Sequence, residues 1–280
     1  MSTNRIVIEP GSEESNYWKD LWSYRGLFYF LAWRDILVRY KQTVIGIAWS
    51  VIRPLLTIGV MAFIGWLFNS DVPAGVPRLL LVCCATLPWQ FFSNSFSEAS
   101  NSLVANSNLL TKVYFPRMIV PASTVIVCLI DFFISFIILL LLMVYYQFVP
   151  DIKILLLPVF LLLALITSMG TGLLIAALNV KYRDFRYVIP FIVQFGLYVS
   201  PVSFTSNDIY NSEKIPQLVK FIYSLNPMVG VIDGFRWCIL GGKTYIHLNG
   251  FLLSVAISFA FLVIGIWNFR KMEKSFADVI

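Results

Sequence analysis

The chain has 280 residues, a formal net charge of +6, 59% hydrophobic residues and only 13% charged residues. A soluble domain usually carries about 25% charged and about 45–50% apolar residues, so this composition argues against a soluble enzyme, a disordered protein and a nucleic-acid-binding domain. The apolar residues form long unbroken runs, which predict an all-α integral membrane protein with several crossings.

The first part of the chain is polar and leads into a basic, aromatic stretch. Residues 1–17 are expected to form a cytoplasmic tail, and residues 18–43 are too charged to cross a bilayer. On a helical wheel, the aromatic residues of this stretch gather on one side, a pattern typical of a helix in the membrane interface. The alternative is a helix packed on the protein's own transmembrane core. The residues on the aromatic side are Trp18, Trp22, Tyr29, Trp33, Ile36 and Tyr40.

Six apolar segments follow within residues 44–280, which we expect to form one transmembrane domain. A helix of about 17–25 residues or longer is enough to cross the hydrocarbon core. Arg53 and Pro54 interrupt the first segment, and Pro88 lies in the second. The expected crossings are residues 44–68, 79–96, 118–149, 154–178, 187–204 and 245–269.

The basic residues predict the orientation, because Lys and Arg accumulate in cytoplasmic loops. If the N-terminus is cytoplasmic, the inner segments and the adjacent Arg53 hold 15 of the 21 basic residues, and the outer segments hold 6. Both termini are therefore expected in the cytoplasm, and the positive charge requires no nucleic acid as a partner. The longest outer segment, residues 205–244, contains two short apolar stretches, 218–225 and 228–240. We expect these to form re-entrant helices, or alternatively helices that cap the outer mouth of a pathway.

Residues suited to catalysis are scarce. The single histidine, His247, lies at the outer end of the sixth crossing, and no acid–base or nucleophile motif accompanies it. The four cysteines lack disulfide or metal-ligand spacing. The sequence GGKT at residues 241–244 ends like a phosphate-binding loop but lacks the first glycine of that motif. We therefore expect no catalytic residue, no metal and no cofactor bound by this chain.

Two charged residues are expected at membrane depth, Arg53 in the first crossing and Asp131 in the third. A charge near the bilayer centre costs about 2.5–3.5 kcal/mol on insertion scales. We therefore predict that Arg53 and Asp131 form an ion pair between helices. Alternatively, Arg53 faces a cytoplasmic entrance and binds an anionic headgroup.

The second crossing ends in alternating aromatic and small polar residues, including Trp89, Phe92 and Phe96. This pattern suits a pathway for sugars, since pyranose rings stack on aromatic rings while their hydroxyls need hydrogen-bond partners. Ordinary helix–helix packing is the alternative, because polar groups within a crossing commonly face other helices.

Five motifs in this sequence resemble, in the same order, the ABC exporter permeases of the second type, in their polysaccharide and polyol-phosphate branch. The first motif runs from Arg39-Tyr40-Lys41-Gln42 through Gly46 and Trp49 to Pro54-Leu55-Leu56. The others are NLLTKVYFPRMIVP (108–121), LNVKYRDFRYVIP (178–190), LYVSPVSF (197–204) and LNPMVGVIDGFRW (225–237). The family includes permeases that export lipid-linked O-antigen, capsular polysaccharide and teichoic acid.

The resemblance implies a homodimer in the bacterial inner membrane, joined to two copies of a cytoplasmic ATPase that uses ATP and Mg. The cargo would be a polysaccharide, first of all O-antigen, on an undecaprenyl pyrophosphate carrier. It would pass along an aromatic path at the dimer interface, for which the candidates are Trp89, Phe92, Phe96 and Tyr198. The candidates for binding the carrier headgroup are Arg25, Arg34, Arg39, Lys41 and Arg53.

Two cytoplasmic loops, residues 106–117 and 180–186, either set the topology through their basic residues or dock a soluble partner. By resemblance, the first loop holds the main helix that couples the permease to its ATPase. The coupling candidates are Lys112, Tyr114, Phe115, Arg117 and Arg183.

Other functions stay open at this point. A capsular polysaccharide or teichoic acid exporter has the same architecture, and so does a drug or lipid exporter. A membrane-embedded glycan-lipid transferase would need an acidic or histidine catalytic set on a large loop, which the sequence does not display.

Overall fold

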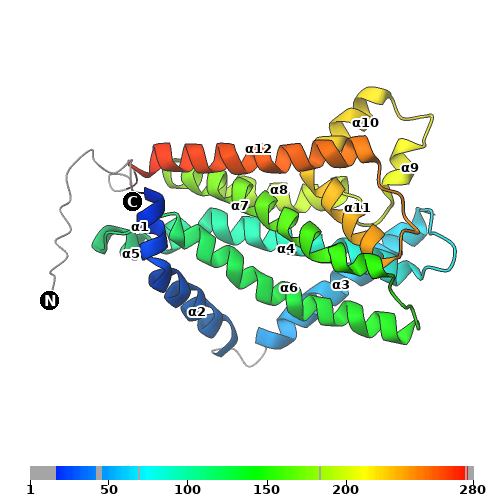
Figure 1. Cartoon of the computed structure of the whole chain (residues 1–280), viewed down its shortest axis with the longest axis horizontal. Coiled ribbons are helices and arrows are strands. Elements are labelled where there is room, and N and C mark those ends of the chain that lie inside the picture. The colour runs from blue at the N-terminus through cyan, green and yellow to red at the C-terminus, as the bar shows by residue number, and fades with distance from the viewer. Residues whose placement is uncertain (1–16, 42–45, 69, 183, 275, 277–280) are drawn as a thin grey trace.

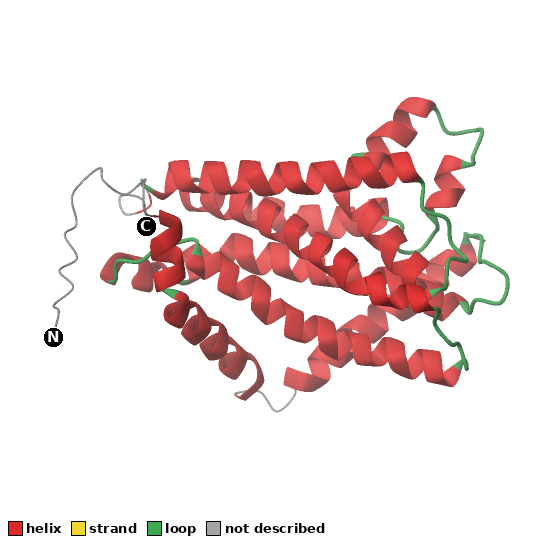
Figure 2. Ribbon diagram, in the orientation of Figure 1, coloured by secondary structure: helices red, strands yellow, loops and turns green. Residues whose placement is uncertain are grey.

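The computed structural model describes residues 17–41, 46–68, 70–182, 184–274 and 276, and every regular element in these ranges is a helix (Figure 2). The long helices lie side by side along one axis, as Figure 1 shows. Helices α1 and α5 and the end of α12 gather at one end of the bundle, and α9 and α10 lie at the other. The expected all-α architecture is confirmed for this part of the chain.

Five helices are long and apolar enough to cross a membrane. The helix that contains the fourth crossing is preceded by the 3-10 helix η1 (Ile152–Leu156). These five helices correspond to the first, second, third, fourth and sixth expected crossings. They are α3 (Gly46–Leu67), α4 (Arg78–Ala105), α6 (Ile119–Tyr145), α7 (Leu157–Lys181) and α12 (Leu248–Glu273).

The fifth expected crossing, residues 187–204, is only partly helical. Helix α8 (Phe185–Val199) has 15 residues, with Pro190 inside it. At 1.5 Å per residue it extends about 22 Å, less than the roughly 30 Å of a hydrocarbon core. A complete crossing at this position therefore stays a prediction.

The N-terminal interface helix is two helices instead of one. Helix α1 (Tyr17–Ser23) and helix α2 (Arg25–Lys41) are separated by a turn at Tyr24. Trp18, Trp22, Tyr29 and Trp33 point outward, while Leu31 and Ala32 are buried, and α2 packs along α6. An exposed aromatic face and a face packed on the transmembrane core are thus both present.

Three helices occupy the long segment between α8 and α12. Helix α10 (Gln217–Ser224) exposes Leu218, Val219, Phe221 and Ile222, whereas α11 is almost wholly buried against α4, α7 and α12. Whether they re-enter the membrane stays a prediction, because the structure contains no bilayer. The other two helices are α9 (Ser206–Tyr210) and α11 (Pro227–Ile239).

Helix α4 forms the centre of the molecule. In its apolar window 83% of the residues are buried, against 22–39% in the other four candidate spans. It packs against α3, α6, α7, α8 and α11. Several of its polar groups form hydrogen bonds inside the protein: the Thr86 hydroxyl donates to the Val82 carbonyl at 2.8 Å, and the Asn179 amide of α7 donates to the Ser100 carbonyl at 2.9 Å. Interior packing explains why this crossing carries so many polar residues.

Helices α7 and α12 approach each other closely because both carry glycine at the contact. A Cβ atom on Gly170 would lie 2.5 Å from the Leu262 backbone nitrogen, and one on Gly265 would collide with the backbone of Gly170. Small residues allow this distance between transmembrane helices. A hydrogen bond of 2.8 Å between the Thr167 and Ser258 hydroxyls lies in the same interface.

We expect Gly170→Ala to destabilise the protein by about 1–3 kcal/mol, the usual penalty for overpacking, because the added methyl group meets fixed backbone atoms. Gly59→Ala is the matched control, since no other atom lies within 4 Å of the Cβ position at Gly59. Thermal unfolding of the purified proteins in detergent measures the difference. Equal melting temperatures for the two variants would contradict the close α7–α12 contact.

Candidate functional site

Asp131 of α6 is the centre of a polar cluster that joins four helices. Its carboxylate forms an ion pair with the Arg39 guanidinium of α2 and accepts a hydrogen bond from the Tyr40 hydroxyl. The Ser50 hydroxyl of α3 donates to the same carboxylate at 3.2 Å. A second nitrogen of Arg39 lies 2.8 Å from an oxygen of Glu98 on α4. The cluster therefore ties the end of the N-terminal helical segment to three transmembrane helices.

The predicted Arg53–Asp131 ion pair is wrong. Arg53 lies on α3 with its side chain exposed, and the cation beside Asp131 is Arg39. The reason is tertiary: α2 packs along α6, so its last turn delivers both Arg39 and Tyr40 to the carboxylate. The sequence prediction considered only charges within the apolar segments, and α2 is not one of the helices long and apolar enough to cross a membrane.

Asp131 and Arg39 form a partly buried ion pair. The side chains of Asp131 and Arg39 are only 17% and 29% exposed, and ion pairs screened from water interact more strongly than surface pairs. Two hydroxyl donors share the remaining hydrogen-bonding capacity of the carboxylate. Arg39 is thus engaged by two carboxylates, and its predicted contact with a lipid headgroup would have to compete with both.

The other headgroup candidates do not converge on one point. Arg34 pairs with Asp35 at 2.7 Å and donates to the Asn106 side chain at 2.9 Å, and Arg25 lies 5.8 Å from the centre of the Trp22 ring. Lys41 and Arg34 border a shallow groove of about 350 Å³ on α2. Of the five headgroup candidates, Arg34 and Lys41 are the two that line this groove.

The three aromatic pathway candidates of α4 lie inside the subunit. Trp89, Phe92 and Phe96 are 4%, 7% and 2% exposed, and their rings contact one another with centroids 5.5 and 5.8 Å apart. Trp89 also packs against the backbone of α8 at Gly196. This arrangement agrees with the packing alternative, and the pathway role of these three residues stays a prediction.

Helix α8 carries the exposed aromatic stripe that the sequence analysis overlooked. Tyr187, Phe191, Phe195 and Tyr198 are all exposed and follow helical spacing on one face. The Phe191 and Phe195 rings stack with centroids 5.7 Å apart. Of the four pathway candidates only Tyr198 belongs to this stripe. The spacing of these aromatic residues, i, i+4, i+8, i+11, was the sequence signal that could have revealed the stripe.

The loop between α4 and α6 divides into exposed and anchored residues. Helix α5 (Ser107–Lys112) ends with the exposed Lys112, and Tyr114 is exposed as well, whereas Phe115 is buried in a cluster at the same end of the bundle. Among the coupling candidates, only Lys112 and Tyr114 present their side chains at the surface. Arg183 lies outside the described residues.

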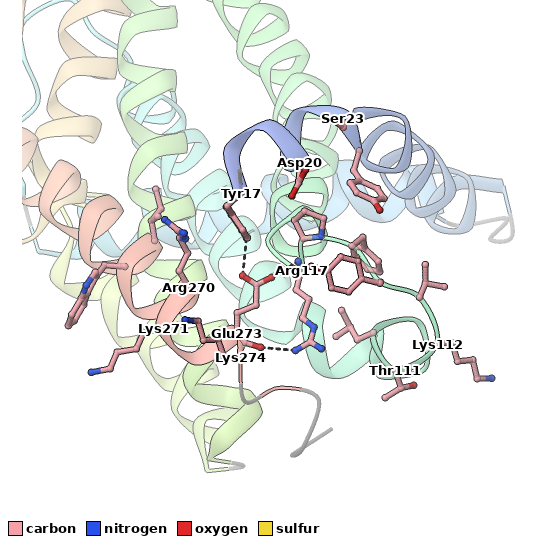
Figure 3. A pocket seen from close by; sticks show the side chains of 18 of the residues that line it. Tyr17, Asp20, Ser23, Thr111, Lys112, Arg117, Arg270, Lys271, Glu273 and Lys274 are labelled. Carbon is pink, nitrogen blue, oxygen red and sulfur yellow. Dashed lines mark hydrogen bonds between the residues drawn. The ribbon is translucent and has the colours of Figure 1, made fainter. Parts of the chain in front are cut away.

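Arg117 is bound within the chain. Its backbone N–H donates to a Glu273 carboxylate oxygen at 2.7 Å, and its guanidinium donates to the Glu273 carbonyl at 2.7 Å. The Tyr17 hydroxyl donates to the other carboxylate oxygen at 3.0 Å (Figure 3). Burial and the nearby Glu273 charge raise the pKa of Tyr17, which keeps the hydroxyl protonated. Arg117 therefore joins the loop to α12, and Glu273 connects both to α1 through Tyr17; the coupling role of Arg117 stays a prediction.

A buried arginine on α11 is a second residue that the sequence analysis overlooked. Arg236 is 1% exposed and donates to three backbone carbonyls, those of Leu81 at 3.2 Å, Phe204 at 2.7 Å and Val202 at 3.0 Å. It thereby holds α4 and the irregular segment after α8 against α11. The sequence signal for this role was the arginine within a short apolar stretch, because a charged side chain in apolar surroundings needs hydrogen-bonding partners.

Residues 26–240 match the family described as ABC-2 type transporter. An O-antigen export system permease protein RfbA from Klebsiella pneumoniae is 25% identical over 255 residues, covering 88% of this chain and 92% of that protein. A protein of the same name from Myxococcus xanthus is 27% identical over 219 residues, covering 78% of this chain and 82% of that protein.

We expect Arg39→Gln and Asp131→Asn each to destabilise the protein by about 1–3 kcal/mol, because each removes one charged hydrogen-bonding partner from a partly buried group. Arg53→Gln is the matched control and should be close to neutral, since the Arg53 side chain is exposed. Thermal unfolding in detergent gives the comparison.

A charge swap distinguishes the two pairings directly. Arg39→Asp combined with Asp131→Arg should recover part of the stability lost in either single variant, whereas Arg53→Asp combined with Asp131→Arg should recover none. Recovery only in the Arg53 combination would overturn the pairing described here.

Proposed function

This chain belongs to the ABC-2 type transporter family, and we propose that it is the permease subunit of an ATP-driven exporter of lipid-linked O-antigen polysaccharide. The observation that carries the proposal is the alignment, over most of both chains, with permeases named for O-antigen export. Five helices able to cross a membrane support a multi-pass inner-membrane protein. Capsular polysaccharide and teichoic acid are the alternative cargoes within the same family.

The energy source is placed on another chain. The GGKT sequence at residues 241–244 follows α11, and Gly241 and Gly242 take positive φ angles in the turn after that helix. It is not followed by a helix N-terminus that would cradle phosphate, since residues up to His247 are irregular. We therefore assign ATP and Mg to two copies of a cytoplasmic ATPase that bind a permease dimer, with α5 and Tyr114 as the docking surface.

The export path is assigned to the exposed aromatic face of the subunit. The α8 stripe of Tyr187, Phe191, Phe195 and Tyr198 offers sugar rings a stacking surface that a second copy of the chain would enclose. The pyrophosphate of an undecaprenyl carrier would meet the basic residues Arg34 and Lys41 at the groove on α2. We propose that both termini lie in the cytoplasm, because the segments on the N-terminal side of the membrane hold most of the basic residues.

A transferase is the second candidate, and His247 is the residue on which it would depend. The His247 ring lies 3.0 Å from the Asn207 side-chain oxygen and contacts the Tyr210 ring at 4.0 Å. Burial lowers the pKa of His247. These partners support a structural role at the start of α12.

Deletion of the gene separates the two functions. We expect the undecaprenyl-linked polymer to accumulate in the cytoplasmic leaflet and to disappear from the cell surface, because synthesis continues while transport stops. Cell fractionation and sugar analysis of both pools measure this, with complementation by the intact gene as control. Loss of polymer synthesis itself would favour the transferase.

The coupling surface has its own test. We expect Lys112→Ala with Tyr114→Ala to reduce co-purification of the ATPase, because both side chains are exposed on the docking loop. The matched control is Lys214→Ala with Tyr245→Ala, an exposed pair at the opposite end of the bundle. Unchanged melting temperatures for both double variants show that folding is intact. Full retention of the ATPase by the Lys112 and Tyr114 variant would exclude this docking surface.

A further inference from the structure

A large cavity opens at the end of the bundle where α1, the loop after α5 and the last turns of α12 meet (Figure 3). Its volume is about 1460 Å³. The groove on α2 that holds Arg34 and Lys41 is lined by other residues, so the two features are separate. Lys112 and Tyr114, which the proposed function assigns to ATPase docking, lie on the wall formed by the loop, and the transport cycle assigns no role to the α12 wall.

The walls of the cavity carry an excess of positive charge. Five basic side chains line it against two acidic ones, Asp20 and Glu273. The Glu273 carboxylate already accepts hydrogen bonds from the Tyr17 hydroxyl and the Arg117 backbone N–H. An anion in the cavity would therefore meet a net positive wall. The basic residues are Lys112, Arg117, Arg270, Lys271 and Lys274.

Helix α12 supplies a wall that changes from apolar to cationic along its length. Val263, Trp267, Arg270 and Lys274 follow one face of the helix at spacings of three and four residues, and all four line the cavity. Their span of 11 residues corresponds to about 16 Å. Val263 and Trp267 are 66% and 61% exposed, and the Lys271 ammonium lies 5.3 Å from the centre of the Trp267 ring. This order of apolar and then basic side chains along the helix matches a phospholipid, with its acyl chain beside Val263 and its phosphate beside the basic residues.

We propose that this cavity binds the phosphate-bearing headgroup of an anionic phospholipid from the surrounding membrane. Basic residues at the end of a membrane helix attract anionic lipids. Val263 lies ten residues, about 15 Å, before the end of α12. This distance is half the thickness of a hydrocarbon core, so the apolar part of the cavity wall favours a lipid over a soluble protein. The bound lipid contacts α1, the loop and α12 together. The inference does not depend on which polymer is exported.

The test uses the full-length permease in nanodiscs of equal parts phosphatidylglycerol and phosphatidylcholine. Native mass spectrometry counts the lipids that remain bound after release from the disc. We expect the wild type to retain phosphatidylglycerol preferentially, and Lys271→Gln with Lys274→Gln to lower that preference on the order of tenfold, from the attraction of two basic residues for an anionic surface. Both substitutions leave the Tyr17–Glu273–Arg117 contacts in place.

A matched control distinguishes binding of the lipid in this cavity from a general attraction of anionic lipid to exposed lysines. Lys19→Gln with Lys181→Gln removes two exposed lysines that do not line the cavity and should leave the preference unchanged. An equal loss in this control would overturn the proposal. Displacement of the lipid by inorganic phosphate would also overturn it, because the ligand would then be a free anion.

A photo-crosslinking amino acid at Val263 identifies the occupant independently of charge. We expect a phosphatidylglycerol adduct in membranes, with a much weaker adduct when the amino acid is placed at Val159, an exposed residue of α7 outside the cavity. An adduct with the ATPase subunit in place of lipid would assign the cavity to protein docking and overturn the proposal.

Discussion

The burial of α4 on nearly all sides is the constraint on which the rest of this structure depends. A crossing surrounded by other helices needs no lipid-facing apolar surface, so it can hold serine, threonine and asparagine if each finds a partner within the protein. It also turns its aromatic run inward, where Trp89 packs against the backbone of α8 at Gly196. The exposed aromatic surface is presented instead by α8, along which we propose that the polymer passes.

Two charged groups inside the helical bundle are accommodated by different physical means. Asp131 is partly exposed and is neutralised by Arg39, with hydroxyl donors completing its hydrogen bonds. Arg236 is fully enclosed and donates to backbone carbonyls, two of them in the irregular segment that follows α8. Irregular backbone persists at depth only where the protein satisfies its polar groups. Arg236 therefore allows α8 to end early while the chain continues inside the protein.

At the end of the bundle that carries the basic residues, hydrogen bonds hold three segments of the chain together. Glu273 joins the loop after α5 to α12 through Arg117 and to α1 through Tyr17, so these three segments share one set of contacts. A displacement of the docking loop would be transmitted to α12 and to the N-terminal helices. The proposed lipid in the adjoining cavity would contact the same junction.

The sequence by itself determined the class of this protein, because hydrophobic run length and the scarcity of charge depend on local composition alone. It located five helices long and apolar enough to cross a membrane, the aromatic side of the N-terminal helical segment, and the family through its motifs. It could not determine which residues meet. Arg39, and not Arg53, neutralises Asp131 because α2 packs along α6, and Trp89, Phe92 and Phe96 turn inward because α4 occupies the centre. Partner choice and burial arise from how helices distant in sequence pack together, and only the tertiary structure decided them.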